Sequence, residues 1–223
     1  INDAFGTAHR AHASTAVIAK FFPEDKAFGT LLAGEIDALD KVLSNPEKPL
    51  TAIIGGAKVS SKLGIIEHLI GRVDRLIVGG GMAYTFVQAQ GGSIGNSLVE
   101  PEMHAQALAI LEKAQSSGTE LLLPADTLCA DAFAQDANTQ VVPTNAIPAD
   151  WMGLDIGPET TARFVDAVLT SKTVLWNGPM GVFEMAAFAN GTNAVAAALA
   201  KATADSGAFT LIGGGDSVAA INQ

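Results

Sequence analysis

The chain has 223 residues, of which 48% are hydrophobic, 16% are charged and 6% are aromatic, and its formal net charge is −10. A chain of this size can bury a substantial aliphatic core, in one large domain or in one domain with a partial neighbour. The acidic balance argues against nucleic acid or anionic lipid as a partner of the whole surface, so a phosphate ligand would need a local cationic pocket.

The first part of the chain carries few strong signals. His9-Arg10-Ala11-His12 is a small basic stretch, but without a fourth partner its spacing is poor for zinc. Residues 27–44 show a helical apolar pattern, and the polar stretch that follows contains Pro46 and Pro49, which indicates a domain boundary. The chain begins at Ile1 rather than at Met and stops within a predicted helix, so we expect a fragment.

Apolar runs alternate with helical patterns over the rest of the chain. This alternation is typical of βαβ units and predicts an α/β fold, a three-layer α/β/α open parallel sheet of the Rossmann-like type. Strands are predicted near 51–54, 75–78, 120–123, 173–176 and 209–212, and helices near 58–70, 82–90, 102–117, 159–170 and 186–204.

Four glycine-containing loops directly follow apolar runs. They are Gly55-Gly56, Gly79-Gly80-Gly81, Asn177-Gly178-Pro179 and Gly213-Gly214-Gly215. In a parallel sheet such loops lie at the carboxyl ends of the strands, where ligands bind and bare backbone lets phosphate oxygens approach the amides. One loop is a weak signal, but four predict a single ligand-lined edge. The G-x-x-x-x-G-K-[ST] and G-x-G-x-x-G patterns are absent, so neither common phosphate-binding motif applies.

Two lysines follow the first glycine pair. In the predicted helix over 58–70, Lys58 and Lys62 lie at i and i+4 in the first turns, beside the buried stripe of Val59, Leu63 and Ile66. Cations at a helix N-terminus oppose the macrodipole unless an anion lies between them and the free amides. The pair therefore favours a phosphate ligand, and two solvated lysines on a surface helix remain the alternative.

Other residues also allow two interpretations. Asp216 could be a helix N-cap or a carboxylate that holds Mg²⁺ beside phosphates, and Glu184 could be a solvated acid or a partner of ribose hydroxyls. The segment Trp151-Met152-Gly153-Leu154 could be a packed loop or one wall of an adenine slot. Cys129 is expected to be a small core residue.

Five segments taken together resemble the phosphoglycerate kinase family. They occur in the family's order from end to end: Asn2 to Arg10, Gly55 to Lys62, Gly79 to Met82, Trp176 to Glu184, and Gly213 to Ser217. The resemblance implies reversible phosphoryl transfer between 1,3-bisphosphoglycerate and MgADP, giving 3-phosphoglycerate and MgATP in glycolysis. It also implies a two-domain fold that closes by hinge motion, with the second, N-terminal domain largely missing from this chain.

The resemblance further implies a division into residues 1–26, the last segment of the substrate-binding domain, 27–49, an interdomain helix and linker, and 50–223, a truncated nucleotide-binding domain. Lys58 and Gly215 would be catalytic, Asp216 would hold Mg²⁺ and Arg10 would bind phosphoglycerate. The implied nucleotide-binding residues are Gly56, Ala57, Lys62, Gly80, Gly81, Gly153, Leu154, Asn177, Pro179, Gly181, Val182, Glu184, Gly214, Gly215, Asp216 and Ser217.

Two functions from different classes remain open. The first is a phosphotransferase, of which this chain alone would be inactive, and the second is a stand-alone nucleotide-binding module without transferase activity. The expected partners are ADP or ATP and phosphoglycerate, with no nucleic acid and no membrane, and a monomer is expected. The lone Cys129 and the lack of a signal peptide or a membrane-length apolar run favour a cytoplasmic location.

Overall fold

The computed structural model describes residues 1–8 and 10–222. The chain divides into two compact units, residues 1–46 and residues 47–223. The first unit holds three short helical turns, η1 (Phe5–Thr7), η2 (Ala13–Val17) and η3 (Ile18–Phe21), followed by α1 (Thr30–Leu43). The helix expected within residues 27–44 is thus confirmed. Among the described residues, no helix combines the length and the apolar character needed to cross a membrane.

A five-stranded parallel sheet forms the centre of the second unit, as predicted. Its strands lie in the order β10-β9-β1-β2-β4, and every neighbouring pair is parallel. The strands are β1 (Leu50–Ile54), β2 (Arg75–Val78), β4 (Glu120–Leu122), β9 (Thr173–Asn177) and β10 (Phe209–Gly213). All five strands of the sheet were expected from apolar runs, because a sheet that is covered on both faces has mostly apolar strands.

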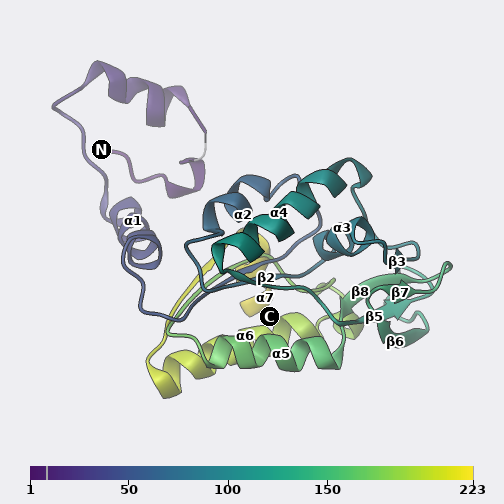
Figure 1. Cartoon of the computed structure of the whole chain (residues 1–223). Helices are drawn as coiled ribbons and strands as arrows, with labels where there is room; N and C mark the ends of the chain where they lie inside the picture. Colours follow the sequence, from purple (N-terminus) through teal and green to yellow (C-terminus); the bar gives the residue numbers. More distant parts are fainter. Residues whose placement is uncertain (9, 223) are drawn as a thin grey trace. The chain divides into compact units, whose positions relative to one another are not determined.

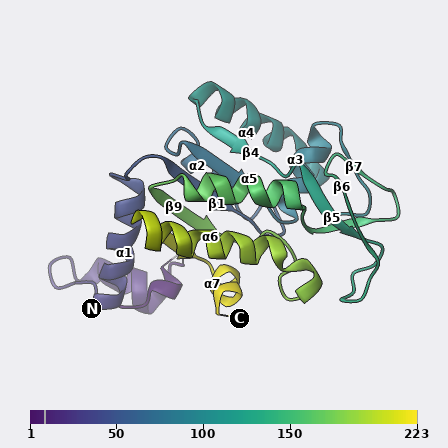
Figure 2. The same ribbon diagram turned by 90° about the horizontal axis from the view of Figure 1, so that it is seen from below.

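Helices cover both faces of this sheet. On one face lie α5 (Pro158–Leu169) and α6 (Asn190–Ser206), and on the other α2 (Leu63–Leu69), α3 (Met82–Ala89) and α4 (His104–Ser117), as Figure 1 and Figure 2 show. Phe164 of α5, Leu199 of α6 and Trp176 of β9 are fully or almost fully buried in the core between the sheet and α5 and α6. The predicted three-layer α/β/α arrangement is therefore confirmed.

The sheet order places a ligand crevice between β1 and β9. From β1 the chain moves outward through β2 to β4 and then returns to β9 on the opposite side of β1. Ligands of open α/β sheets bind outside the carboxyl ends of the strands at such a reversal. The loops after β1 and β9 meet at this point, where Gly55 N donates to Asn177 O at 3.0 Å and Gly56 N donates to Pro179 O at 3.1 Å.

Two small sheets were not predicted. The strands β5 (Asp126–Ala130), β6 (Thr139–Pro143) and β8 (Met152–Ile156) form an antiparallel sheet in the order β6-β5-β8. The strands β3 (Ser93–Ile94) and β7 (Ala146–Ile147) pair as a parallel ladder. Strands β3 and β7 have two residues each, β6 is exposed or only half-buried throughout, and polar residues or glycine interrupt β5 and β8, so none of them leaves a strong apolar run. Cys129 is buried in β5, as expected for a core residue.

The predicted helix over 58–70 begins later than expected. Helix α2 starts at Leu63 with Lys62 as its N-cap residue, and Ser60 to Lys62 form a turn before it. There the Ser61 hydroxyl donates to Lys58 O at 2.8 Å, and Ser60 bonds to Glu100 from a distant segment. Such side-chain bonds compete with the helix. The prediction that both lysines share a face of one helix is therefore wrong.

Replacing Gly178 by Ala should destabilise the second unit. Gly178 has φ +106°, and an added Cβ would lie 2.2 Å from Gly55 O. Left-handed strain and a backbone clash together should cost at least about 2 kcal/mol of unfolding free energy, measurable by urea denaturation. Gly64→Ala is the control, because its Cβ meets nothing within 4 Å inside α2 and should stabilise by about 0.5–1 kcal/mol. Equal midpoints for the two variants would contradict the clash.

Candidate functional site

Two adjoining cavities open at the carboxyl edge of the parallel sheet. The first, of about 320 Å³, is lined by the glycine loops after β1 and β10 together with Lys58 and Lys62, and we call it the lysine cavity. The second, of about 480 Å³, is walled mainly by apolar side chains, and we call it the apolar cavity. Gly56, Ala57 and Asp216 line both. Each volume lies in the range typical of small-molecule sites.

The lysine cavity concentrates positive charge in an acidic protein. Lys62 is half-buried, and its ammonium donates a hydrogen bond to the side-chain oxygen of Asn177 at the end of β9. Burial lowers the pKa of Lys62 below its ordinary value, and the Asp216 carboxylate opposes part of that shift. Lys58 is exposed at the same cavity. An anion bound between these groups would favour the charged form of Lys62, so the cavity suits a phosphate.

The loop after β10 supplies backbone donors to the same cavity. Gly214, with φ +89°, is the N-cap residue of α7 (Gly215–Ile221), so the interpretation of Asp216 as an N-cap is wrong. The first amides of a helix have no partners within it and can bind anions. The buried Ser217 hydroxyl accepts a hydrogen bond from Gly178 N at 2.6 Å, which ties this loop to the loop after β9.

The apolar cavity has the walls expected of a slot for a planar ring. Met152, Gly153 and Leu154 of β8 line one part, which agrees with the adenine-slot interpretation of that segment. Leu98 and Phe133 also line it and remain 47% and 60% exposed. Large apolar side chains left in contact with water around a cavity indicate a binding surface.

A buried carboxylate supports the loop that carries Glu184. Asp155 of β8 is 1% exposed and accepts hydrogen bonds from Gly191 N and Ile156 N, both at 2.8 Å. An added Cβ on Gly181 would lie 2.3 Å from its Oδ1, so the loop rests directly on this carboxyl group. Burial raises the pKa of Asp155 to about 7, although both hydrogen bonds act in the opposite direction.

Asp155 should make the stability of the chain depend on pH. Its folded pKa of about 7 lies above the ordinary unfolded value, so the folded state binds the proton more tightly between about pH 4 and pH 7. The free energy of unfolding should therefore fall as pH rises through that window and level off above it. Relative to Asp155→Asn, the wild type should lose roughly 2 kcal/mol between pH 5 and pH 8 in urea denaturation. Parallel pH profiles of the two proteins would contradict this.

The structure brings the predicted nucleotide residues together. Lys58 and all sixteen residues of the nucleotide-binding set line one or both cavities. Several other lining residues were not predicted as site residues, among them Tyr84, Asn96, Leu98, Phe133 and Phe183. Phe133 carried a usable signal, because it is a lone aromatic residue in a polar loop, whereas Leu98 and Tyr84 resemble ordinary core residues in the sequence.

Arg10 lies in the first unit, where its amide donates to Thr7 O at 3.0 Å. Its role in binding phosphoglycerate stays a prediction. His9, from the same basic stretch, lies outside the described residues. Within the part of the chain that is described, no group of three or more His, Cys, Asp or Glu side chains could hold a metal ion.

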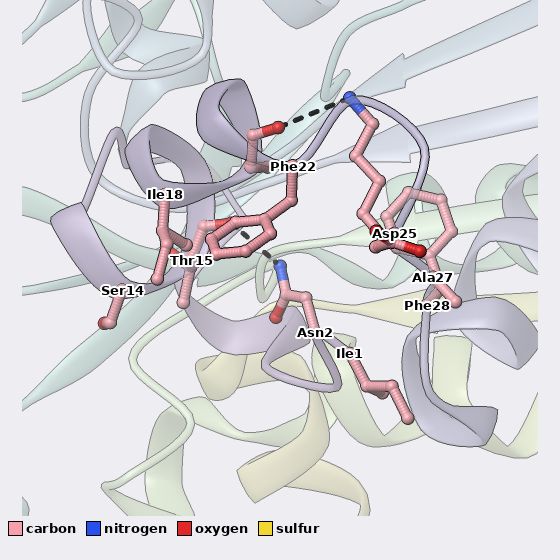
Figure 3. A pocket seen from close by; sticks show the side chains of 11 residues that line it. Ile1, Asn2, Ser14, Thr15, Ile18, Phe22, Asp25, Ala27 and Phe28 are labelled. Carbon is pink, nitrogen blue, oxygen red and sulfur yellow. Dashed lines mark hydrogen bonds between the residues drawn. The ribbon is translucent and has the colours of Figure 1, made fainter.

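A larger cavity, of about 580 Å³, lies within the first unit. Figure 3 shows Ile18, Phe22 and Phe28 among its walls, with Asn2 Nδ2 donating to Thr15 O at 3.5 Å. Its volume exceeds that of either cavity of the second unit, but none of the predicted site residues line it. The case for a nucleotide site therefore rests on the second unit alone.

Comparison with known proteins identifies the family. The family model described as phosphoglycerate kinase matches residues 1–223. The chain belongs to the phosphoglycerate kinase family. It is 54% identical over 223 residues to "Phosphoglycerate kinase, cytosolic" of Triticum aestivum and 55% identical over 223 residues to the phosphoglycerate kinase of Herpetosiphon aurantiacus. The structure of phosphoglycerate kinase from Coxiella burnetii covers 99% of the chain with 45% identity and a TM-score of 0.91.

The phosphoglycerate kinases that match are longer than this chain. The chain covers 55% of the Triticum and Herpetosiphon proteins and 56% of the Coxiella structure. It therefore spans about half the length of the curated relatives it matches. The more distant phosphoglycerate kinase structure from Pyrococcus horikoshii, at 28% identity, still gives a TM-score of 0.81 over 99% of the chain. The fold predicted from the resemblance is thus shared across widely separated members of the family.

Proposed function

We propose that this chain provides the nucleotide-binding half of an enzyme that transfers a phosphoryl group reversibly between 1,3-bisphosphoglycerate and MgADP, as the name of its family indicates. The observation that carries the proposal is the joining of a cationic, glycine-lined cavity to an apolar slot at the reversal point of the sheet. This combination fits a ligand with a planar base at one end and phosphates at the other. The reaction belongs to glycolysis, and relatives named cytosolic support a cytoplasmic location.

The bound nucleotide would extend from the apolar cavity to the lysine cavity. The base lies against Leu154 and Val182, and the exposed Glu184 carboxylate accepts hydrogen bonds from ribose hydroxyls. Lys62 and the first amides of α7 bind the phosphates of the nucleotide. Lys58, together with the Gly215 amide, stabilises the charge on the phosphoryl group during transfer. Such a reaction is catalysed by positioning and electrostatics, so it requires no protein nucleophile.

Magnesium fits this donor set. Asp216 is exposed and lines both cavities, so its carboxylate lies where the phosphates of a bound nucleotide would end. Mg²⁺ in proteins is commonly held by one or two carboxylates together with substrate phosphate oxygens. When bound with the nucleotide, the ion would neutralise phosphate charge that Lys58 and Lys62 only partly balance.

Binding of phosphoglycerate would involve residues other than those that line the two cavities. By resemblance, Arg10 would bind the phosphate or carboxylate of phosphoglycerate, and its guanidinium suits bidentate contact with either. The matched relatives are nearly twice as long, so we propose that the chain alone is inactive and that the active enzyme is a monomer that includes the remaining part.

Calorimetric titration of the purified chain with MgADP tests the nucleotide site directly. We expect saturable binding of one equivalent, and weaker binding of ADP in EDTA because Asp216 then lacks its metal. The same titration of a Lys62→Ala variant tests whether MgADP binds in the lysine cavity, because loss of the ammonium group should then weaken the binding. No binding of MgADP at millimolar concentration would overturn the proposed function. If the chain is instead a nucleotide-binding module without transferase activity, it should bind MgADP in the same way. A full-length relative whose matching part is replaced by this chain should then be inactive.

A further inference from the structure

A buried acid outside both cavities contacts the turn that carries the two lysines. Glu100 is 8% exposed and lines neither cavity, and the proposed reaction makes no use of it. Its Oε2 accepts a hydrogen bond from Ser60 N at 3.0 Å, and its Oε1 accepts one from the Ser60 hydroxyl. A buried carboxylate is costly unless it is bonded in this way. Both of its oxygens thus accept hydrogen bonds from Ser60.

The surroundings of Glu100 keep it ionised at neutral pH. Burial acts to raise its pKa, but the hydrogen bonds from the Ser60 hydroxyl and amide and from Val59 N, with the nearby charge of Lys58, bring the pKa below its usual range. Hydrogen bonds to a charged group are stronger than those between neutral groups. The contact between Glu100 and Ser60 is therefore stronger than a hydrogen bond between two neutral groups.

Ser60 stands midway between Lys58 and Lys62 in a turn that is not helical. Within the turn, Lys62 N donates to Val59 O at 2.9 Å and the Ser61 hydroxyl donates to Lys58 O at 2.8 Å. A regular helix would fix the directions of both lysines by its own backbone bonds, but here α2 begins only at Leu63. Besides the bond from Lys62 to Asn177, the contact of Ser60 with Glu100 joins this turn to a distant segment of the chain.

The other side of Glu100 is anchored in the core beside the apolar cavity. Glu100 N donates to the hydroxyl of Thr85, a residue of α3 that is 1% exposed, at 3.1 Å. Two residues earlier Leu98 lines the apolar cavity, and the Ser97 hydroxyl accepts a hydrogen bond from Gly153 N at 2.9 Å. The segment 96–100 therefore joins the wall of the apolar cavity to the turn of the lysine cavity.

We propose that Glu100 is a positioning residue, which holds the turn from Lys58 to Lys62 so that both ammonium groups face the phosphates of a nucleotide. This inference rests on the nucleotide site proposed above. The carboxylate of Glu100 bonds to the turn of the lysine cavity, whereas its backbone amide makes the bond to Thr85, so loss of the carboxylate should weaken the binding of phosphorylated ligands and spare the binding of the nucleoside. A residue that merely stabilised the fold would affect both ligands alike.

The test compares MgADP with adenosine, each titrated into the chain by calorimetry. Glu100→Gln should weaken MgADP binding about five- to twentyfold, as expected for lost charged hydrogen bonds, and leave adenosine binding within twofold. Ser60→Ala removes only the hydroxyl donor at an exposed position and should weaken MgADP binding about threefold. Because both changes affect the same contact, the double variant should lose less than the product of the two.

Glu102→Gln is the matched control, since it removes the same charge two residues away at an exposed position of η4 (Pro101–Met103). It should bind both ligands like the wild type. The positioning role is overturned if Glu100→Gln and Ser60→Ala bind MgADP like the wild type, or if adenosine binding falls as much as MgADP binding. Absence of MgADP binding by the wild type is a separate result, which would overturn the proposed function and this role with it.

Discussion

The chain alone should show no detectable conversion of 3-phosphoglycerate and ATP to 1,3-bisphosphoglycerate and ADP. In-line transfer requires both substrates to be held together, and such positioning can contribute about 7–11 kcal/mol to lowering a barrier. The proposed site in the two cavities of the second unit would hold the nucleotide alone, whereas the matched relatives have nearly twice the length over which to build the rest of the site. A coupled assay that follows ADP release, with purified chain at micromolar concentration, measures this.

The positive control is a chimera in which this chain replaces the matched 55% of the Triticum relative. At 54% identity the replaced and the new segments should share a backbone, so the chimera should turn over with rates near those of the unmodified relative. Turnover by the chain alone within tenfold of the chimera would contradict the requirement for the remaining length. It would show that the residues described here hold both substrates.

The parallel sheet was predictable because the apolar run and the glycine loop that mark a strand lie next to each other in the sequence. Strand β1 is buried at all five positions and is apolar at all of them except Thr51, and the glycine loop that follows marks its end. The same reasoning located the other four strands of this sheet. The glycines themselves were equally informative, since Gly55 and Gly178 pack backbone against backbone and leave no space for a side chain.

The features that escaped prediction depend on contacts between distant segments. Helix α2 begins at Leu63 because Ser60 bonds to Glu100, forty residues away, and no local pattern in either segment reveals that pairing. The walls of the apolar cavity show the same limit. Leu98 and Phe133 reach the cavity from two loops that lie far apart in the sequence, so no local pattern shows that both line it.

The two lysines should respond differently to removal. Lys62 is half-buried and already bonded to Asn177, so it is held in place before a ligand arrives. Lys62→Ala should therefore weaken MgADP binding to the chain by roughly 1.5–3 kcal/mol, the contribution of a hydrogen bond to a charged group. Calorimetry measures the loss. Lys201→Ala, which removes an exposed lysine of α6, is the control for charge alone and should leave the affinity unchanged.

Lys58 is exposed and lies in the turn before α2, so its interaction should strengthen mainly when charge develops on the transferring phosphoryl group. In the chimera, Lys58→Ala should lower kcat and kcat/KM together, by at least a hundredfold, while MgADP affinity changes less than threefold, because the contact is made chiefly in the transition state. Steady-state kinetics and calorimetry on the same preparation separate the two quantities. If Lys58→Ala instead raises KM with kcat unchanged, both lysines serve ground-state binding. If neither lysine variant differs from Lys201→Ala in affinity or rate, both are solvated surface residues and the phosphates bind elsewhere.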